Sequence, residues 1–201
     1  MTYVSLAALG FGAVVGALAS VATAEPIAYS IDPGHSAAAF RYNHAGFSTT
    51  YGMIQGVEGE ILFDRDIPAN SSVEVTLDLA NFDTGWAARD SHLLDTGDFF
   101  DPKVRQISFR STGIDVTGPE TAKISGDLTL NGVTKPITLD ASLTTAGEYP
   151  FPPNQGKPAA GFTATTTLTR SEYGLGMFAP FISDEVEVEI SIEAISGREP
   201  A

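Results

Sequence analysis

The sequence of 201 residues contains no cysteine. This absence excludes disulfide bonds, thiolate metal sites and cysteine nucleophiles, so a hydrophobic core must hold the fold together unaided. Basic residues are also scarce: 11 Lys and Arg stand against 25 Asp and Glu, which gives a formal net charge of −14 at pH 7. Because nucleic-acid affinity depends on cations that neutralise phosphates, we expect no nucleic-acid partner.

Charged side chains are missing from residues 1–24. This segment is rich in Leu, Ala, Val and Gly, and it ends in Val21-Ala22-Thr23-Ala24, the small-x-small pattern that signal peptidase reads. The usual basic n-region is lacking, which leaves an uncleaved membrane anchor as the alternative. Glycines interrupt the apolar run, however, and no basic stop-transfer flank follows it. We therefore predict a cleaved signal peptide over residues 1–24 and one exported domain over residues 25–201.

Alternating apolar and polar residues dominate the predicted domain. In residues 185–193 every second residue is apolar, the pattern of a strand with one dry face. Asn131-Gly132 separates two such stretches and favours a type I′ hairpin, which needs positive φ at both positions. The chain therefore predicts an all-β fold of roughly eight antiparallel strands that form a single barrel. The other predicted strands are 29–44, a stretch from Gly52, 60–64, 72–79, 107–114, 122–130, 137–143 and 162–169.

Residues 84–100 do not alternate. Trp86, Leu93 and Leu94 recur at helical intervals, and Thr84 is available as an N-cap. We expect one or two short helices here that close one end of the barrel. Residues 147–158, which include four prolines, are predicted to form an exposed connection.

Several motifs, in this order and spacing, resemble those of the YceI-like family of exported, lipocalin-like lipid-binding proteins. The resemblance spans nearly the whole predicted domain. Its motifs include Asp32-Pro33-Gly34-His35-Ser36, Arg89-Asp90-Ser91-His92-Leu93-Leu94 and Asp127-Leu128-Thr129-Leu130-Asn131-Gly132. The full set covers residues 29–36, Phe40, 44–48, 89–94, 98–101, 107–112, 126–136 and 170–175.

The resemblance implies an extended eight-stranded barrel whose interior binds an isoprenoid lipid, such as a polyprenyl chain or a quinone tail, in the bacterial periplasm. A barrel of this size either is filled by its own side chains or holds one ligand. Each five-carbon unit removed from water contributes about 3–4 kcal/mol gross, so the tail can dominate binding. We expect transport or storage of the lipid without catalysis and without a required cofactor. Transient contact with a membrane or a membrane protein, and a homodimer, follow by family analogy.

Aromatic residues, methionines and one leucine are the candidates for contact with the lipid tail, because their side chains adapt to a branched chain. The alternative for each is ordinary core packing. Residues 173–181 combine glycines with apolar groups, which also suits a gate over the barrel mouth. The candidates are Phe40, Phe47, Met53, Phe63, Trp86, Leu93, Phe99, Phe100, Phe109, Tyr173, Met177, Phe178 and Phe181.

Four basic side chains are candidates for the lipid head group: His44, Arg89, His92 and Arg170. A buried arginine needs a carboxylate partner, or it can meet a phosphate or a quinone carbonyl. For both arginines we favour a structural ion pair that ties the helix to the barrel.

The three histidines leave a metal-assisted enzyme open as an alternative function. His35, His44 and His92, with Asp32 or Asp90, supply metal-ligating atoms, but none has a close partner at ligand spacing. We therefore assign no metal and no catalytic residue.

Residues 174–179 match G-x-G-x-x-A without any βαβ context, so they indicate no nucleotide site. The remaining alternative is an accessory partner of a membrane redox protein.

Overall fold

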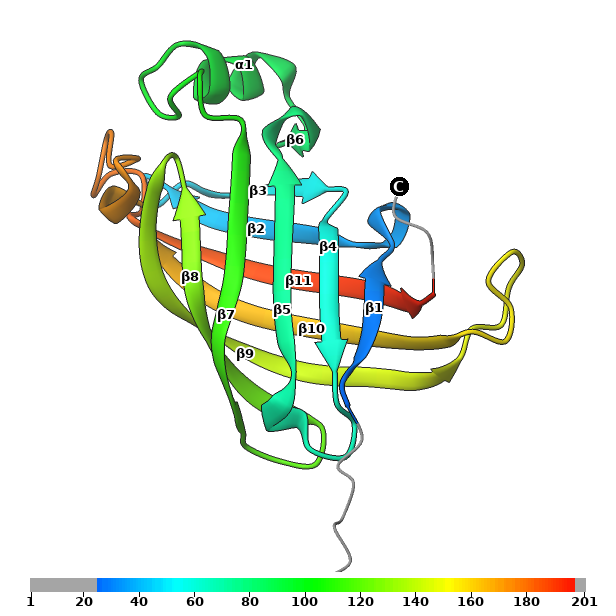
Figure 1. The fold of residues 1–201 in the computed structure, drawn as a ribbon. Coiled ribbons are helices and arrows are strands. Elements are labelled where there is room, and N and C mark those ends of the chain that lie inside the picture. The colour runs from blue at the N-terminus through cyan, green and yellow to red at the C-terminus, as the bar shows by residue number, and fades with distance from the viewer. Residues whose placement is uncertain (1–24, 198–201) are drawn as a thin grey trace, which may run out of the picture.

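The computed structural model describes residues 25–197, which form eleven strands, one α-helix and four short 3-10 helices (Figure 1). No helix in this range has the length and apolar character needed to cross a membrane. The predicted signal peptide lies outside the described residues. The strands are β1 (Ile27–Ile31), β2 (Ala37–His44), β3 (Ser48–Gln55), β4 (Glu58–Phe63), β5 (Ser72–Asp78), β6 (Phe82–Asp83), β7 (Gln106–Val116), β8 (Thr121–Leu130), β9 (Val133–Glu148), β10 (Pro158–Thr169) and β11 (Glu185–Ser196).

Eight of these strands close into a ring in the order β1-β4-β5-β7-β8-β9-β10-β11, and β11 returns to β1. Every ladder is antiparallel, and the closing pair includes Ile31 opposite Ala194. A closed ring leaves no exposed edge among its members. The predicted eight-stranded antiparallel barrel is therefore confirmed.

A second group of strands, β2, β3 and β6, extends from the same edge of β11 that closes the ring. The end of β11 pairs with β1, whereas residues 187–191 pair with β2. The predicted strand 29–44 is therefore divided in two by the 3-10 helix η1 (Pro33–His35). Pro33 has no backbone N–H to offer a ladder, and the Asp32 carboxylate accepts the Gly34 N–H at 3.0 Å.

The β8–β9 hairpin confirms the turn prediction, since φ is 51° at Asn131 and 75° at Gly132. The Asn131 side chain also accepts the Asp101 N–H at 2.7 Å and donates to the Tyr173 carbonyl at 3.1 Å. The hairpin tip therefore joins the segment after α1 to the 3-10 helix η4 (Arg170–Tyr173).

Helix α1 (Ala87–Asp95) is a single short helix above one end of the barrel (Figure 1). The prediction that Thr84 caps it was wrong, because Trp86 occupies the N-cap position without a side-chain bond. Gly85, at φ 76°, turns the chain between Thr84 and the helix, so the Thr84 side chain contacts residues farther along. The remaining 3-10 helices are η2 (Pro68–Asn70) and η3 (Leu79–Asn81).

Candidate functional site

The barrel encloses a cavity of about 770 Å³. Every ring strand except β1 contributes side chains to its lining, and β2 and β3 add more. The alternation seen in the sequence explains this lining, since every second residue of a strand faces the interior. Representative lining residues, one from each of six strands, are Ile61, Val75, Phe109, Leu128, Leu139 and Ile192.

The residues that line the cavity come from both ends of the barrel. The strands that run between these two ends can be followed in Figure 1. One end is bounded by α1 and residues 175–182, and we call it the mouth. The other end is bounded by the β4–β5 connection, which includes Pro68, and by the β7–β8 turn, which includes Pro119. An elongated apolar cavity of this form suits a long, flexible hydrocarbon chain better than a compact polar ligand.

Asp64 fixes the β4–β5 connection at the end opposite the mouth. It is buried, and one carboxylate oxygen accepts the N–H groups of Asp66 at 3.0 Å and Ile67 at 2.7 Å. The other oxygen accepts the Asn70 amide at 3.1 Å. The bond from Ile67 is the main reason that the pKa of Asp64 lies below its ordinary value. The carboxylate therefore holds this connection in place while it is ionised.

Arg170 fixes the segment at the mouth. Its guanidinium donates to the carbonyls of Ser183 at 2.9 Å and Ile182 at 2.8 Å, and also to the carbonyl of Leu175. Burial lowers the pKa of Arg170, and the nearby Asp184 opposes that shift. The predicted ion pair between this arginine and the helix is replaced by a clamp on three backbone carbonyls, which accounts for much of its donor capacity.

Thr84 connects Arg89 and Asp90. The Arg89 guanidinium donates to the Thr84 hydroxyl at 2.7 Å and to its carbonyl at 2.6 Å. The Asp90 carboxylate accepts the Thr84 N–H at 3.0 Å and its hydroxyl proton. The two charged groups thus anchor the start of α1 through one threonine, and Arg89 also lies 5.8 Å from the ring centre of Trp86.

Comparison with known proteins agrees with this geometry. Residues 29–194 match the model of the YceI-like domain. The chain is 38% identical over 194 residues to a UPF0312 protein of Pseudomonas aeruginosa, covering 95% of this chain and 97% of that protein. It is 35% identical over 196 residues to Protein YceI of Escherichia coli O157:H7, covering 96% of this chain and 98% of the other. The chain belongs to the YceI-like family.

Solved structures show the same fold. A Campylobacter jejuni YceI protein aligns with a TM-score of 0.67 and 26% identity, covering 78% of this chain and 90% of that one. Burkholderia cenocepacia BcnA aligns with a TM-score of 0.71 at 21% identity, covering 81% and 98%. A domain from Saccharophagus degradans, described as polyisoprenoid binding, aligns with a TM-score of 0.61 at 14% identity, covering 85% and 99%.

Most residues predicted to contact the lipid line the cavity of this YceI-like protein. They come from the strands, from α1 and the residues on either side of it, and from η4 and the segment after it. The predicted residues in the lining are Phe40, His44, Phe63, Trp86, Arg89, His92, Leu93, Phe99, Phe100, Phe109, Arg170 and Phe178.

The structure places the other five predicted residues outside the lining. Phe47 follows a turn at Ala45 and Gly46 and is 92% exposed, while Phe181 is 77% exposed. Tyr173 is instead buried at 1% exposure, in ordinary core packing. Met53 and Met177 complete the group outside the lining; Met53 pairs with Asp83 on β6 and is 38% exposed.

Sequence reasoning missed the aliphatic part of the lining. Ile, Leu, Val and Ala side chains of the strands form much of the wall, including Ala164 on β10. The signal was available, because these residues share the inward parity of the aromatic candidates. It was not decisive, since inward parity is the same for lining and for packed core.

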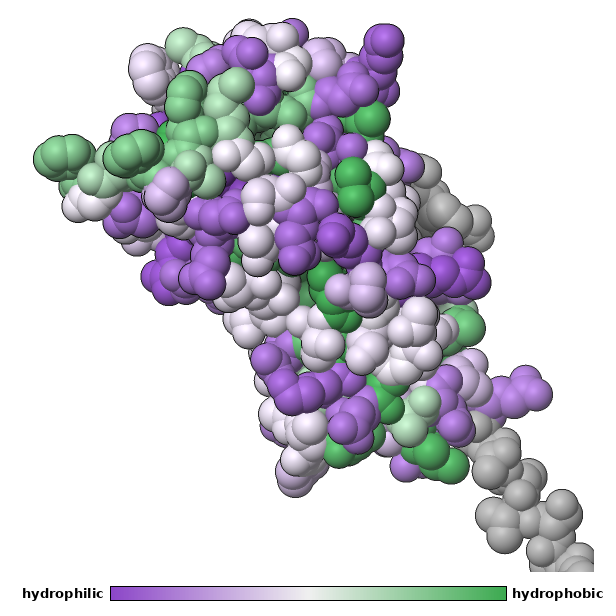
Figure 2. Space-filling view, turned by 90° about the vertical axis from the view of Figure 1, so that its left-hand side faces the viewer, coloured by the Kyte–Doolittle hydropathy of each residue, from purple (hydrophilic) through white to green (hydrophobic). Residues whose placement is uncertain are grey.

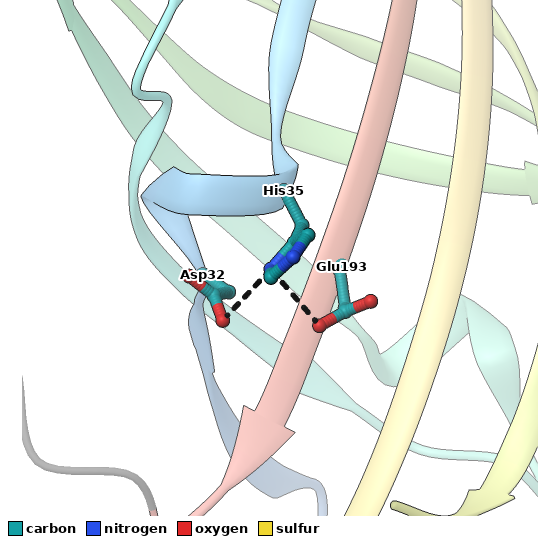
Figure 3. A group of neighbouring side chains, drawn as sticks. All are labelled: Asp32, His35 and Glu193. Atoms are coloured by element: carbon teal, nitrogen blue, oxygen red, sulfur yellow. Dashed lines mark hydrogen bonds and ion pairs between the residues drawn. The ribbon is translucent and has the colours of Figure 1, made fainter. Parts of the chain in front are cut away.

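The histidines do not assemble a common metal site. His44 and His92 line the cavity, whereas His35 lies near Asp32 and Glu193 beside the end of β11 (Figure 3). Its Nδ1 lies 3.3 Å from Asp32 Oδ2 and 3.7 Å from Glu193 Oε1, and the three ligand atoms lie within 4.8 Å of one another. Within residues 25–197 no group of three such ligands includes His44 or His92. The His35 ring is exposed, whereas the Asp32 and Glu193 side chains are partly buried.

Proposed function

We propose that this YceI-like protein binds an isoprenoid lipid in its barrel and carries or stores it in the periplasm, without catalysing a reaction on it. The observation that carries the proposal is the apolar cavity of about 770 Å³ between the mouth and the opposite end. Its volume falls within the range of roughly 300–1,000 Å³ that is usual for ligand pockets. The solved domain described as polyisoprenoid binding supports the ligand class.

The chemistry of the lining supports a tail-dominated mode of binding. Nearly the whole wall is hydrocarbon, so each buried unit of the chain gains free energy from its removal from water. The branched methyl groups of an isoprenoid match the mixed aromatic and aliphatic surface, in which rings such as those of Phe63 and Phe162 lie edge to face at 5.3 Å.

The head group is expected at the mouth, where the lining includes His44, Arg89 and His92. The His92 side chain is half exposed, and its Nε2 lies 3.6 Å from Asp98 Oδ2. The centres of the His92 and Phe99 rings are 5.5 Å apart, and the rings meet edge to face. Arg89 and His44 also reach the lining there. These donors suit the oxygen atoms of a quinone or a phosphate. The acidic surface and the predicted signal peptide support a soluble carrier in the periplasm.

The test is a titration of delipidated protein with isoprenoid alcohols of increasing chain length. Trp86 is the only tryptophan and lines the cavity, so its fluorescence reports binding. Affinity should rise with each added unit until the cavity is full and then level off. Affinity that does not depend on chain length would contradict the proposal. The control is the Ala164→Phe variant, whose narrowed cavity should shift the plateau to shorter chains.

A further inference from the structure

Three phenylalanines project from the mouth into solvent, and we call them the mouth collar: Phe47, Phe178 and Phe181. They are 92%, 55% and 77% exposed. The Ala45 N–H donates to the Phe181 carbonyl at 2.7 Å and joins the two loops that carry them. Figure 2 shows apolar surface gathered at the upper left of this face, on the side of the molecule where the segment after η4 lies in Figure 1.

The two chain segments of the collar carry almost no charge. Residues 43–53 and 173–183 contain no Asp, Glu, Lys or Arg, although the chain has 36 such residues (11 basic and 25 acidic). His44 is their only titratable group besides tyrosine. An apolar surface without interspersed charge can leave water at little electrostatic cost.

The collar is held in place and is continuous with the cavity. Phe178 adopts φ 62°, which bulky residues rarely adopt, and the Arg170 clamp holds the carbonyls on both sides of it. The Phe178 ring lies 6.1 Å from that of Phe99, and both residues line the cavity. A hydrocarbon chain that leaves the cavity at this point meets the collar next.

Two candidates could cover the mouth collar, a second copy of this chain and a lipid bilayer, and net charge distinguishes between them. A second copy of this chain also carries −14, so the two copies repel each other at long range. A bilayer of zwitterionic lipid has no net charge and accepts aromatic side chains at its interface. We propose that the mouth collar enters the interfacial region of a lipid bilayer, so that a lipid passes between membrane and cavity without crossing water. This inference rests on the proposed function.

Flotation with phosphatidylcholine vesicles tests the proposal on the full domain. Wild-type protein should float with the vesicles equally in low and high salt, because the collar has no charge to screen. The Phe47→Ser/Phe181→Ser double variant should lose at least about tenfold in partitioning, given the apolar area removed. The Phe151→Ser variant is the matched control. Phe151 is 65% exposed but lies on the β9–β10 loop, so its loss should leave flotation unchanged.

Three outcomes would overturn the proposal: no flotation of wild type, equal flotation of the double variant, or a wild-type dimer that the double variant breaks without any vesicle binding. Sedimentation velocity detects the last, in which a second copy is the occupant. Phe47 and Phe181 lie outside the cavity lining, so the double variant should still bind isoprenoid alcohols in detergent solution. Lost flotation with retained alcohol binding isolates the collar, whereas failed alcohol binding by wild type refutes the proposed function instead.

Discussion

Two regions of the barrel interior look alike in sequence and differ in what they face. Where β1, β10 and β11 meet, Ile31, Ala160 and Ala194 are buried against one another's strands and fill the space. Farther along the barrel, Leu128 and Leu139 are almost as inaccessible, at 8% and 7% exposure, but they face the cavity. Alternation determines that a side chain points inward. Whether it meets another side chain or open space depends on how closely the opposite wall approaches.

The packed region contains small residues in register. Ala194 lies opposite both Ile31 and Ala160 in the strand registers, and two alanines in neighbouring strands allow a close approach of the walls. The cavity region also contains small residues in register, since Ala141 lies opposite both Ala122 and Ala164, so residue size alone does not distinguish the two regions. This comparison predicts that the same substitution has different effects in the two regions.

The largest expected effect is on stability, from truncation in the packed region. Ile31→Ala should lower the free energy of unfolding by about 2–5 kcal/mol, because it creates a new cavity that its neighbours cannot fill. Leu139→Ala removes the same number of carbon atoms from a wall that already faces open space, so its cost should be about 2 kcal/mol. Urea denaturation measures both. Equal losses would show that the two regions do not differ.

Substitution of an alanine by a larger residue also distinguishes the two regions. Ala160→Phe overpacks the filled region and should destabilise the fold by about 1–3 kcal/mol or more. Ala164→Phe, four residues along the same strand, places its ring in the cavity and should leave stability nearly unchanged. It should instead weaken binding of long isoprenoid alcohols. If Ala164→Phe destabilised the protein as much as Ala160→Phe, the cavity would not be open space.

Loss of the Arg170 clamp should destabilise the segment at the mouth and leave the barrel strands unchanged. In Arg170→Lys a single ammonium cannot reach the three separate carbonyls, so we expect a loss of about 1–3 kcal/mol. Hydrogen exchange should accelerate at Ala179 and Ile182, whose N–H groups bond within this segment, and not in β9. Arg41→Lys is the control, since its ion pair with Glu187 is exposed to solvent and contributes little to stability. Uniform acceleration over the barrel would contradict a local clamp.

The smallest expected effect concerns pH at the end opposite the mouth. The pKa of Asp64 is lower in the folded protein than its ordinary 3.8, mainly through the Ile67 N–H. Its contribution to stability is therefore complete above pH 3.8 and is lost as the pH falls through the folded pKa. Asp64→Asn should be less stable than wild type at neutral pH, and the difference should shrink on acidification. Thermal melts of both proteins between neutral pH and the folded pKa of Asp64 measure this difference in stability. The control is Asp66→Asn, at an exposed neighbouring position. A difference between Asp64→Asn and wild type that does not change with pH would contradict the prediction.

The sequence predicted the ring strands, the Asn131-Gly132 turn and a helix within residues 84–100, because each depends on local periodicity or turn chemistry. It did not predict the division of residues 29–44, which depends on β11 pairing with two strands along one edge. It also did not separate lining from exposed aromatics at the mouth. That separation depends on turns at Ala45 and Phe178, whose positive φ has no signal in these residue types.

The hydrogen-bond partners of Arg170 were also beyond prediction from the sequence. A buried Arg170 pointed to a carboxylate or a ligand, but the structure supplies three backbone carbonyls from residues 175–183. Backbone acceptors are invisible to motif reasoning because every residue has one.

The most direct measurement of the central claim is the mass of the lipid extracted by organic solvent from protein purified without added detergent. The account predicts close to one isoprenoid lipid per chain, with the amount strongly reduced in Ala164→Phe and unchanged in Phe151→Ser. Extracts without a stoichiometric lipid, together with failure of the delipidated barrel to take up any isoprenoid alcohol, would contradict it.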